Sequence, residues 1–322
     1  MRCFAKLFAL TGFLTISAPS SLLAAGAPCF SPLQLSDAGN TVIHESANWH
    51  RDVRIVTTDF NLVNNASFAA ESPTRSVATE EFWIDAHEVT NRQFSAFVAA
   101  TGYITTAERA PDPQDYPGVA DSLLVPGSAS FIKLEDRPAG QWREWWKFIK
   151  GANWREPEGA GSSIDRREDY PVIHVSYVDA LAYADWVGRA LPTEAQWELA
   201  AQASINIDRA NTWQGFFPLQ DKALDGYDGI APVGCYSPDA YGLFDMKGNV
   251  SEMVSDIYLP KAGSELSASI APVRVIKGSS FLCAENYCDH PDPHARQGQE
   301  QDFSTDHVGF RTVARSAIET AH

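Results

Sequence analysis

The clearest helical pattern in the chain follows a short apolar segment within residues 81–103. Thr90 is a residue type that caps helix N-termini, and the positions after it carry apolar side chains at helical spacing: Phe94, Phe97 and Val98. The residues just before Thr90 predict a strand, and a weaker strand pattern lies in residues 60–68. The sequence therefore predicts a strand followed by an α-helix over 81–103.

Residues 170–203 predict a strand-like entry followed by two helices. Asp179 is expected to start the first helix, with one side formed by Ala182, Tyr183 and Trp186. Thr193 is expected to cap the second helix, because Gln196 stands three residues further on and completes a capping box. These are the last clear helical patterns in the chain.

The remaining segments have little periodicity. Residues 104–170 form a long aromatic connection, which we expect to pack on the body of the domain and to border a binding surface. From residue 204 onward, Gly, Pro, Asn and Asp interrupt short aromatic segments, so roughly half of the domain is predicted to be irregular. Bound cations are one way to hold so much ordered loop together.

The composition is that of a folded protein with a large aromatic core. Of the 322 residues, 44% are hydrophobic, and they include 9 Trp and 17 Phe. This composition excludes a disordered chain. The formal charge of −16 at pH 7 argues against nucleic acid and anionic membrane surfaces as partners. No hydrophobic stretch after the N-terminal segment is long enough to predict a membrane span.

The N-terminus has the order of features found in secretory signal peptides. Arg2 and Lys6 precede an apolar run that is too short to cross a bilayer, and small residues follow it. We therefore expect residues 1–27 to be removed on export and the mature protein to be periplasmic or secreted. After the signal peptide we expect an N-terminal extension, one domain and a short tail, with boundaries at 28–48, 49–316 and 317–322.

The expected mature chain keeps four cysteines, which are Cys29, Cys235, Cys283 and Cys288. An even number in an exported protein is typical of disulfides, and a pairing of Cys29 with Cys235 is left open. Cys283 and Cys288 are five positions apart. This spacing fits a small disulfide-closed loop, but two thiolates on a short loop would also form a soft site that selects Cu(I) over harder cations. The spacing alone leaves both alternatives open.

Six segments resemble, in order, the signature blocks of one family, the formylglycine-generating enzymes or sulfatase-modifying factors. These segments are FWIDAHEVTNRQFSAFV, YPVIHVSYVDALAYADWVGRALPTEAQWELAA, NTWQGFFP, YGLFDMKGNVSEMVSD, IKGSSFLCAENYC and HVGFR. They extend from about residue 50 to about residue 315. The resemblance implies a single α+β, C-type-lectin-like fold that has little regular secondary structure and is stabilised by calcium.

The resemblance also implies an activity. Enzymes of this family use O2 to oxidise a cysteine in a Cys-x-Pro-x-Arg peptide of a sulfatase to formylglycine. It implies that Cys283 and Cys288 are catalytic and bind Cu(I). Ser280 then holds the position of the family's active-site serine, and Arg296 that of an arginine lining the pocket. The expected partners are O2 and an exported sulfatase or another peptide with a cysteine, and a monomer is expected.

Two calcium sites are implied as well. The first would use side-chain and main-chain oxygens of one turn, from Asp245, Gly248, Val250 and Glu252. The second would combine two short segments, through Asn211, Thr212, Asp225 and Tyr227. Alternating side-chain and carbonyl oxygens on a glycine-containing turn suit Ca2+, which accepts flexible geometry and more than four oxygen ligands.

The sequence departs from the family pattern around the cysteines. Ser251 and Met253 replace two tryptophans, and residues 289–293 lose two arginines and gain two prolines. Two disulfides of some members are also absent, because both partners of each are replaced: Ala184 with Thr312, and Ala201 with His294. The altered rim leaves open another substrate, such as a pyoverdine-type siderophore precursor, or a non-catalytic binding module.

Overall fold

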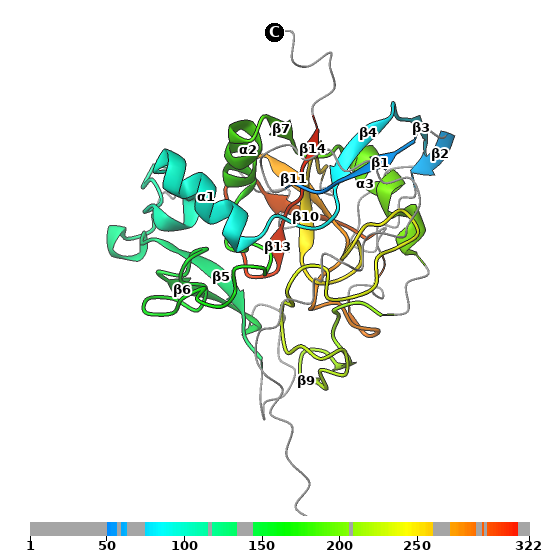
Figure 1. Cartoon of the computed structure of the whole chain (residues 1–322). Helices are drawn as coiled ribbons and strands as arrows, with labels where there is room; N and C mark the ends of the chain where they lie inside the picture. The colour runs from blue at the N-terminus through cyan, green and yellow to red at the C-terminus, as the bar shows by residue number, and fades with distance from the viewer. Residues whose placement is uncertain are drawn as a thin grey trace, which may run out of the picture.

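The computed structural model describes the chain in several stretches, which are residues 50–56, 59–62, 75–114, 118–133, 144–205, 209–259, 271–287, 292 and 295–314. The expected signal peptide and N-terminal extension, Cys288 and the C-terminal tail lie outside these residues. The described part is a mixed α/β fold of short helices, short strands and long connections (Figure 1). The expectation of an α+β fold with little regular secondary structure is therefore confirmed.

Two four-stranded sheets lie in the middle of the molecule (Figure 1). The first is antiparallel, in the order β1 (Asp52–Ile55), β4 (Phe82–Asp85), β14 (Val313–Ala314) and β7 (Arg189–Ala190). The second has the order β12 (Arg296–Glu300), β11 (Val273–Lys277), β10 (Ser251–Ile257) and β13 (Val308–Gly309), with β10 and β13 parallel. The described residues add three ribbons, which are β2 (Asp59–Leu62) with β3 (Arg75–Ala78), β5 (Gly127–Phe131) with β6 (Trp146–Lys150), and β8 (Gly215–Phe216) with β9 (Gln220–Asp221).

The helices of the described residues are short. They are α1 (Asn91–Thr101), α2 (Tyr177–Trp186) and α3 (Glu194–Ala201), with the 3₁₀ turns η2 (Thr106–Glu108), η3 (Asp121–Leu123) and η5 (Gln202–Ser204). None of them has the length and apolar character that a bilayer crossing needs. Thr90 and Thr193 cap α1 and α3, as predicted; the capping box of Thr193 was expected, and Thr90 forms one as well.

The predicted start of α2 was wrong, since the helix begins two residues before Asp179. Ser176 caps this helix, and Asp179 is the third helical residue, whose carboxylate closes a capping box with the Ser176 backbone at 2.8 Å. Trp186 is 42% exposed, whereas Tyr183 is buried and stacks on Phe94 of α1 with ring centroids 5.9 Å apart. The contact with α1 decides which side of α2 is buried, and this contact cannot be found from helical spacing alone.

The second central sheet separates two buried apolar clusters. Val254 of β10 and Val275 of β11 face a cluster that contains Trp197 of α3. Their neighbours in sequence, Met253 and Ile276, face the other cluster, which contains the apolar sides of α1 and α2. Successive residues of a strand point to opposite faces of the sheet. Since both faces are covered, these strands lack the alternation of polar and apolar residues from which a strand is predicted.

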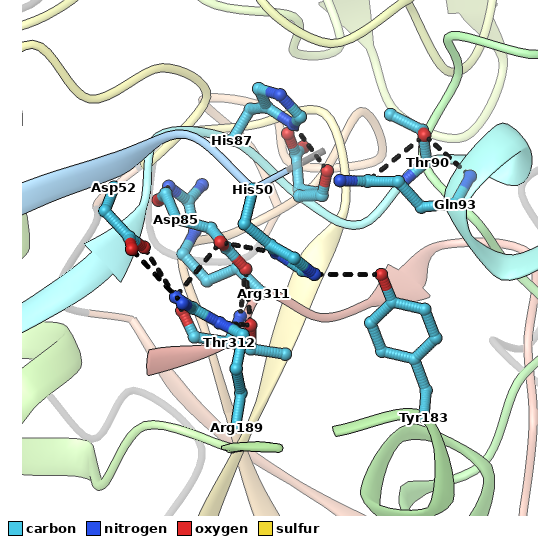
Figure 2. A network of polar contacts seen from close by, with 11 residues as sticks. His50, Asp52, Asp85, His87, Thr90, Gln93, Tyr183, Arg189, Arg311 and Thr312 are labelled. Atoms are coloured by element: carbon cyan, nitrogen blue, oxygen red, sulfur yellow. Dashed lines mark hydrogen bonds and ion pairs between the residues drawn. The ribbon is translucent and has the colours of Figure 1, made fainter. Parts of the chain in front are cut away.

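A buried polar network joins the strands of the first sheet (Figure 2). Asp85 of β4 contacts His50 Nδ1 at 2.8 Å and accepts a hydrogen bond from the Thr312 hydroxyl at 2.6 Å. Arg189 of β7 donates to Thr312 Oγ1 at 2.6 Å and to Asp52 Oδ1 of β1 at 2.7 Å. Burial alone would raise the pKa of Asp85, but Arg189 and His50 outweigh burial and lower it. Thr312 is part of this polar network. Some members of the family that the sequence resembles have a disulfide cysteine at this position.

Candidate active site and cation-binding loops

The cysteine loop comprises residues 278–295 and joins β11 to β12. Cys283 in this loop is 1% exposed, and it is a free thiol in the structure. Ala284 and Tyr287 exchange two backbone hydrogen bonds of 3.2 and 3.0 Å, so the chain reverses directly after Cys283. Cys288 lies outside the described residues. Of the two predicted copper ligands, the structure therefore describes Cys283 only, as a buried free thiol directly before a tight turn.

Ser280 lies at the beginning of the same loop and is buried. Its carbonyl accepts a hydrogen bond from the Cys283 N–H at 3.0 Å, and its hydroxyl accepts one from the Leu282 N–H at 3.3 Å. Ser279 before it has a φ of 59°, a conformation that favours glycine. The structure therefore brings Ser280 and Cys283 together in one turn.

An aromatic cluster surrounds the turn that carries Cys283. It comprises Phe131, Trp213, Phe217, Phe281, Leu282 and Ala284, with Trp145, Trp146, Ile230 and Tyr287 packed against it. The Cys283 carbonyl accepts a hydrogen bond from the Trp213 N–H at 3.0 Å, and Tyr287 stacks on Phe217 at 4.1 Å. Trp145 and Trp146 come from the long connection 104–170, which packs on the body of the domain as expected.

Arg296 occupies the first position of β12, at the end of the cysteine loop. Its Nε donates to Glu194 Oε1 of α3 at 2.6 Å, and its guanidinium lies over the ring of Tyr258 at 4.9 Å. The Nη1 atom is buried and has no hydrogen-bond partner among the described residues. The Nη1 atom of Arg296 can therefore donate a hydrogen bond to a further group. The role of Arg296 in a substrate pocket stays a prediction.

The loop of Asn211 and Thr212 meets the loop of Asp225 and Tyr227, and these are the residues expected for one calcium site. Asp225 accepts hydrogen bonds from the Thr212 N–H at 3.0 Å and the Tyr227 N–H at 3.1 Å. The Gln214 amide nitrogen donates both to the Thr212 carbonyl and to Asp225 Oδ2. A carbonyl and a carboxylate that converge on one donor are suited to hold a cation there.

The turn that carries the other predicted calcium ligands is closed by unusual backbone conformations. Asp245 has a φ of 56° and Gly248 a φ of 85°. A Cβ atom at Gly248 would collide with the Asn211 carbonyl, so the two calcium loops touch at a glycine. Glu252 already forms an ion pair, because both of its carboxylate oxygens accept hydrogen bonds from Arg311 at 2.6 Å. Its availability as a metal ligand stays a prediction.

Glu88, which the sequence did not suggest, lies with this turn. The side chain is fully buried, Oε1 accepts from Asn249 Nδ2 at 3.0 Å, and Oε2 has no hydrogen-bond partner among the described residues. Burial, together with the charges of Asp245 and Glu252, raises the pKa of Glu88 well above its usual value. Burial likewise raises the pKa of Asp245 to about 6. The positive charge of Arg311 lowers both pKa values but does not outweigh burial, so a divalent cation here would add compensating charge.

The described residues contain no group of three or more His, Cys, Asp or Glu side chains arranged to hold a metal. Each predicted calcium loop offers fewer carboxylates than that and relies on carbonyl oxygens, so this absence does not test it. Cys235 takes part in a disulfide. Its partner lies outside the described residues, since Cys283 is free, and whether Cys29 pairs with Cys235 stays open.

Comparison with known proteins gives the family. Residues 42–316 match the family model described as a sulfatase-modifying factor enzyme 1-like domain. The chain therefore belongs to the sulfatase-modifying factor family, also named after formylglycine-generating enzymes. It is 39% identical to the formylglycine-generating enzyme of Mycobacterium tuberculosis over 287 residues, which cover 79% of this chain and 94% of that protein.

Other relatives agree on the family and differ in activity. The formylglycine-generating enzyme of Thermomonospora curvata is 40% identical, over 76% of this chain and 85% of its own. The inactive Cα-formylglycine-generating enzyme 2 of Mus musculus is 36% identical, over 76% and 78%. The solved structure of PvdO from Pseudomonas aeruginosa has a TM-score of 0.53 at 20% identity, covering 82% of this chain and 94% of that one. This last likeness supports the fold alone.

Proposed function

We propose that the protein is a copper-dependent oxidase that uses O2 to convert a cysteine of an exported sulfatase, in a Cys-x-Pro-x-Arg motif, to formylglycine. The observation that carries this proposal is Cys283, a buried free thiol that lies three residues after Ser280 and directly before the Ala284–Tyr287 turn. Ala284 and Tyr287 are paired across the turn that follows Cys283. The identity with named formylglycine-generating enzymes supports the same activity.

The residues around Cys283 suit this chemistry. Two thiolates, from Cys283 and Cys288, would hold Cu(I), and the bound copper would supply the one-electron reactivity toward O2 that side chains lack. The aromatic cluster keeps water away from the turn and so strengthens polar interactions within it. Ser280 fixes the turn through its carbonyl, and the unpaired Arg296 Nη1 is suited to bind a carbonyl or carboxylate of a peptide.

Calcium would hold the irregular half of the domain beneath the cysteine loop. The pKa values of Glu88 and Asp245 stay raised although Arg311 lowers both, and Asn249 connects the two loops through its contacts with Glu88 and Asn211. The Phe281 N–H donates to the Asn249 carbonyl at 2.9 Å, which ties the calcium turn to the cysteine loop. We also place the mature protein outside the cytoplasm, on the basis of the signal-peptide pattern of residues 1–27.

One observation favours a second candidate, in which the same oxidation acts on a different substrate, such as a siderophore precursor. Ser251 is 3% exposed at a position where the family pattern has a tryptophan near the active site. A smaller buried side chain changes the shape of the site without removing Cys283. A cysteine pair that stays inert, as in a binding module, is the remaining alternative.

Cu(I) binding and peptide oxidation together distinguish these candidates. The reduced protein is titrated anaerobically with Cu(I) and then given a Cys-x-Pro-x-Arg peptide in air. The proposal predicts stoichiometric copper binding and aldehyde formation, both lost in Cys283→Ser and in Cys288→Ser. Copper binding without aldehyde would favour the other substrate, and no copper binding would exclude both oxidase functions.

A further inference from the structure

Both ends of the cysteine loop carry a buried positive charge. Lys277 is the last residue of β11 and Arg296 the first residue of β12, and they form the cross-strand pair from which the loop leaves the sheet. The Lys277 side chain is 0% exposed and that of Arg296 is 9% exposed. Buried charges of this kind require counterions, since burial without one is strongly unfavourable.

One helix supplies both counterions. Glu194 and Glu198 are four residues apart on α3 and therefore lie on the same side of it. Glu198 Oε1 contacts Lys277 Nζ at 2.6 Å, and both side chains are 0% exposed. Glu194 Oε1 contacts Arg296 Nε at 2.6 Å, and the Glu194 side chain is 5% exposed. Two carboxylates at a fixed spacing on one helix thus hold the entry and the exit of the cysteine loop.

The same helix contacts the first residue of the loop. A Cβ atom at Gly278 would lie 2.8 Å from the Trp197 ring, so the loop leaves the sheet in direct contact with α3. Trp197 also lies under Lys277 Nζ, at 5.9 Å from its ring centroid, and donates from Nε1 to Glu252 at 2.8 Å. Helix α3 therefore contacts the cysteine loop and its two strand ends at three residues, which are Lys277, Gly278 and Arg296.

We propose that Glu194 and Glu198 are positioning residues that set the geometry of the cysteine loop for copper binding. The inference rests on the copper site of the proposed function. Buried ion pairs contribute little net stability but can fix one arrangement among several. In this protein the arrangement fixed is that of the two strands whose connection contains Cys283, with both strand ends tied to one rigid helix.

Glutamine variants of the two carboxylates test this role. Glu194→Gln and Glu198→Gln remove a counterion while keeping the side-chain size. Asp52→Asn is the matched control, because Asp52 is a buried carboxylate that pairs with Arg189 in the first sheet, away from the cysteine loop. Cu(I) affinity is measured by competition with a colorimetric chelator, and the melting temperature of each variant is recorded in parallel.

Both glutamine variants are expected to bind Cu(I) about 10-fold or more weakly, as is typical when groups that orient metal ligands are lost. Asp52→Asn is expected to lower the melting temperature and leave Cu(I) affinity unchanged. Glu194→Asp keeps the charge and should retain more Cu(I) affinity than Glu194→Gln. This pair of Glu194 variants tests the proposal if the Glu198 variant does not fold.

Several outcomes would overturn the proposal. If Glu194→Gln binds Cu(I) as tightly as the unsubstituted protein, the ion pairs do not position the loop. If Glu194→Asp loses as much affinity as Glu194→Gln, the charge is not what matters. If the unsubstituted protein itself binds no Cu(I), the copper site fails, and this inference fails with it.

Discussion

Asp306 is a partly buried carboxylate, with its side chain 17% exposed, in the wall of a cavity of about 500 Å³ next to the aromatic cluster. Its Oδ2 accepts from the Phe131 N–H at 2.8 Å, while its Oδ1 has no hydrogen-bond partner among the described residues. Burial raises the pKa of Asp306 to about 7. The neighbouring His307 and His174 cannot offset this charge near neutral pH, because burial lowers their pKa values to about 3 and about 4.

The stability of the protein is therefore expected to fall as pH rises through 7. In the folded state Asp306 keeps its proton up to about pH 7, whereas the unfolded chain loses it near 4, so folding is favoured at low pH and loses this contribution as the folded group ionises. Between pH 5 and 8 the melting temperature should decrease, and this decrease should be smaller in Asp306→Asn. Identical pH profiles of the two proteins would refute the assignment to Asp306.

The Thr312 hydroxyl lies in the buried polar network, at a position where some family members have a disulfide cysteine. Thr312→Val removes the hydroxyl that donates to Asp85 and accepts from Arg189, at similar side-chain size. We expect a loss of about 1–3 kcal/mol in the free energy of unfolding, because a buried carboxylate loses a donor. Thr312→Ser keeps the hydroxyl and should lose less. Denaturant unfolding measures both, and equal losses would show that the hydroxyl is not the stabilising group.

At the level of single residues, only the site residues that lie within a family motif could be predicted from the sequence. Ser280 and Cys283 fall in one turn because they are only three residues apart, while their catalytic role stays a prediction. Glu88 was missed, since a lone glutamate after a strand has no distinguishing pattern and becomes significant only when Asp245 is folded beside it. The ion pair of Arg296 with Glu194 joins residues from α3 and β12, and no spacing in the sequence indicates it.

The contact between α3 and the start of the cysteine loop can be tested with two glycines. Gly278 and Gly242 both have a φ of 91°, so alanine causes similar backbone strain at each. Alanine at Gly278 would in addition lie 2.8 Å from Trp197, whereas nothing lies within 4 Å of a Cβ at Gly242. Gly278→Ala should therefore lose roughly 1–3 kcal/mol more in unfolding free energy than Gly242→Ala. Equal losses would mean that α3 does not restrain the loop.

Whole elements were predicted from sequence when their signal is local. The capping boxes of α1 and α3 involve residues three apart, and both helices begin where expected. The start of α2 was placed two residues too late, and the strands of the second sheet were not predicted. Those strands carry buried charged residues, Glu252 and Lys277, whose counterions come from distant segments, Arg311 and Glu198.

At the scale of the whole molecule, the irregular half of the domain should depend on calcium. Calcium that binds only the folded state at about 100 times its dissociation constant adds ~2.7 kcal/mol, and for a domain of this size that corresponds to roughly 5–10 °C in melting temperature. Chelation should lower the midpoint by about this amount, and Glu88→Gln should reduce the effect of chelation. An unchanged midpoint on chelation, in protein that contains no calcium after purification, would exclude the calcium loops.

The most direct test of the proposed activity is the mass of a peptide. A Cys-x-Pro-x-Arg peptide is incubated in air with the Cu(I)-loaded protein, and its cysteine is followed by mass spectrometry, with Cys283→Ser as the matched control. The account predicts conversion of the cysteine to an aldehyde, which a hydrazine reagent captures, with no conversion in the variant. A peptide that keeps its thiol in the presence of protein with stoichiometric copper would contradict the sulfatase-directed activity.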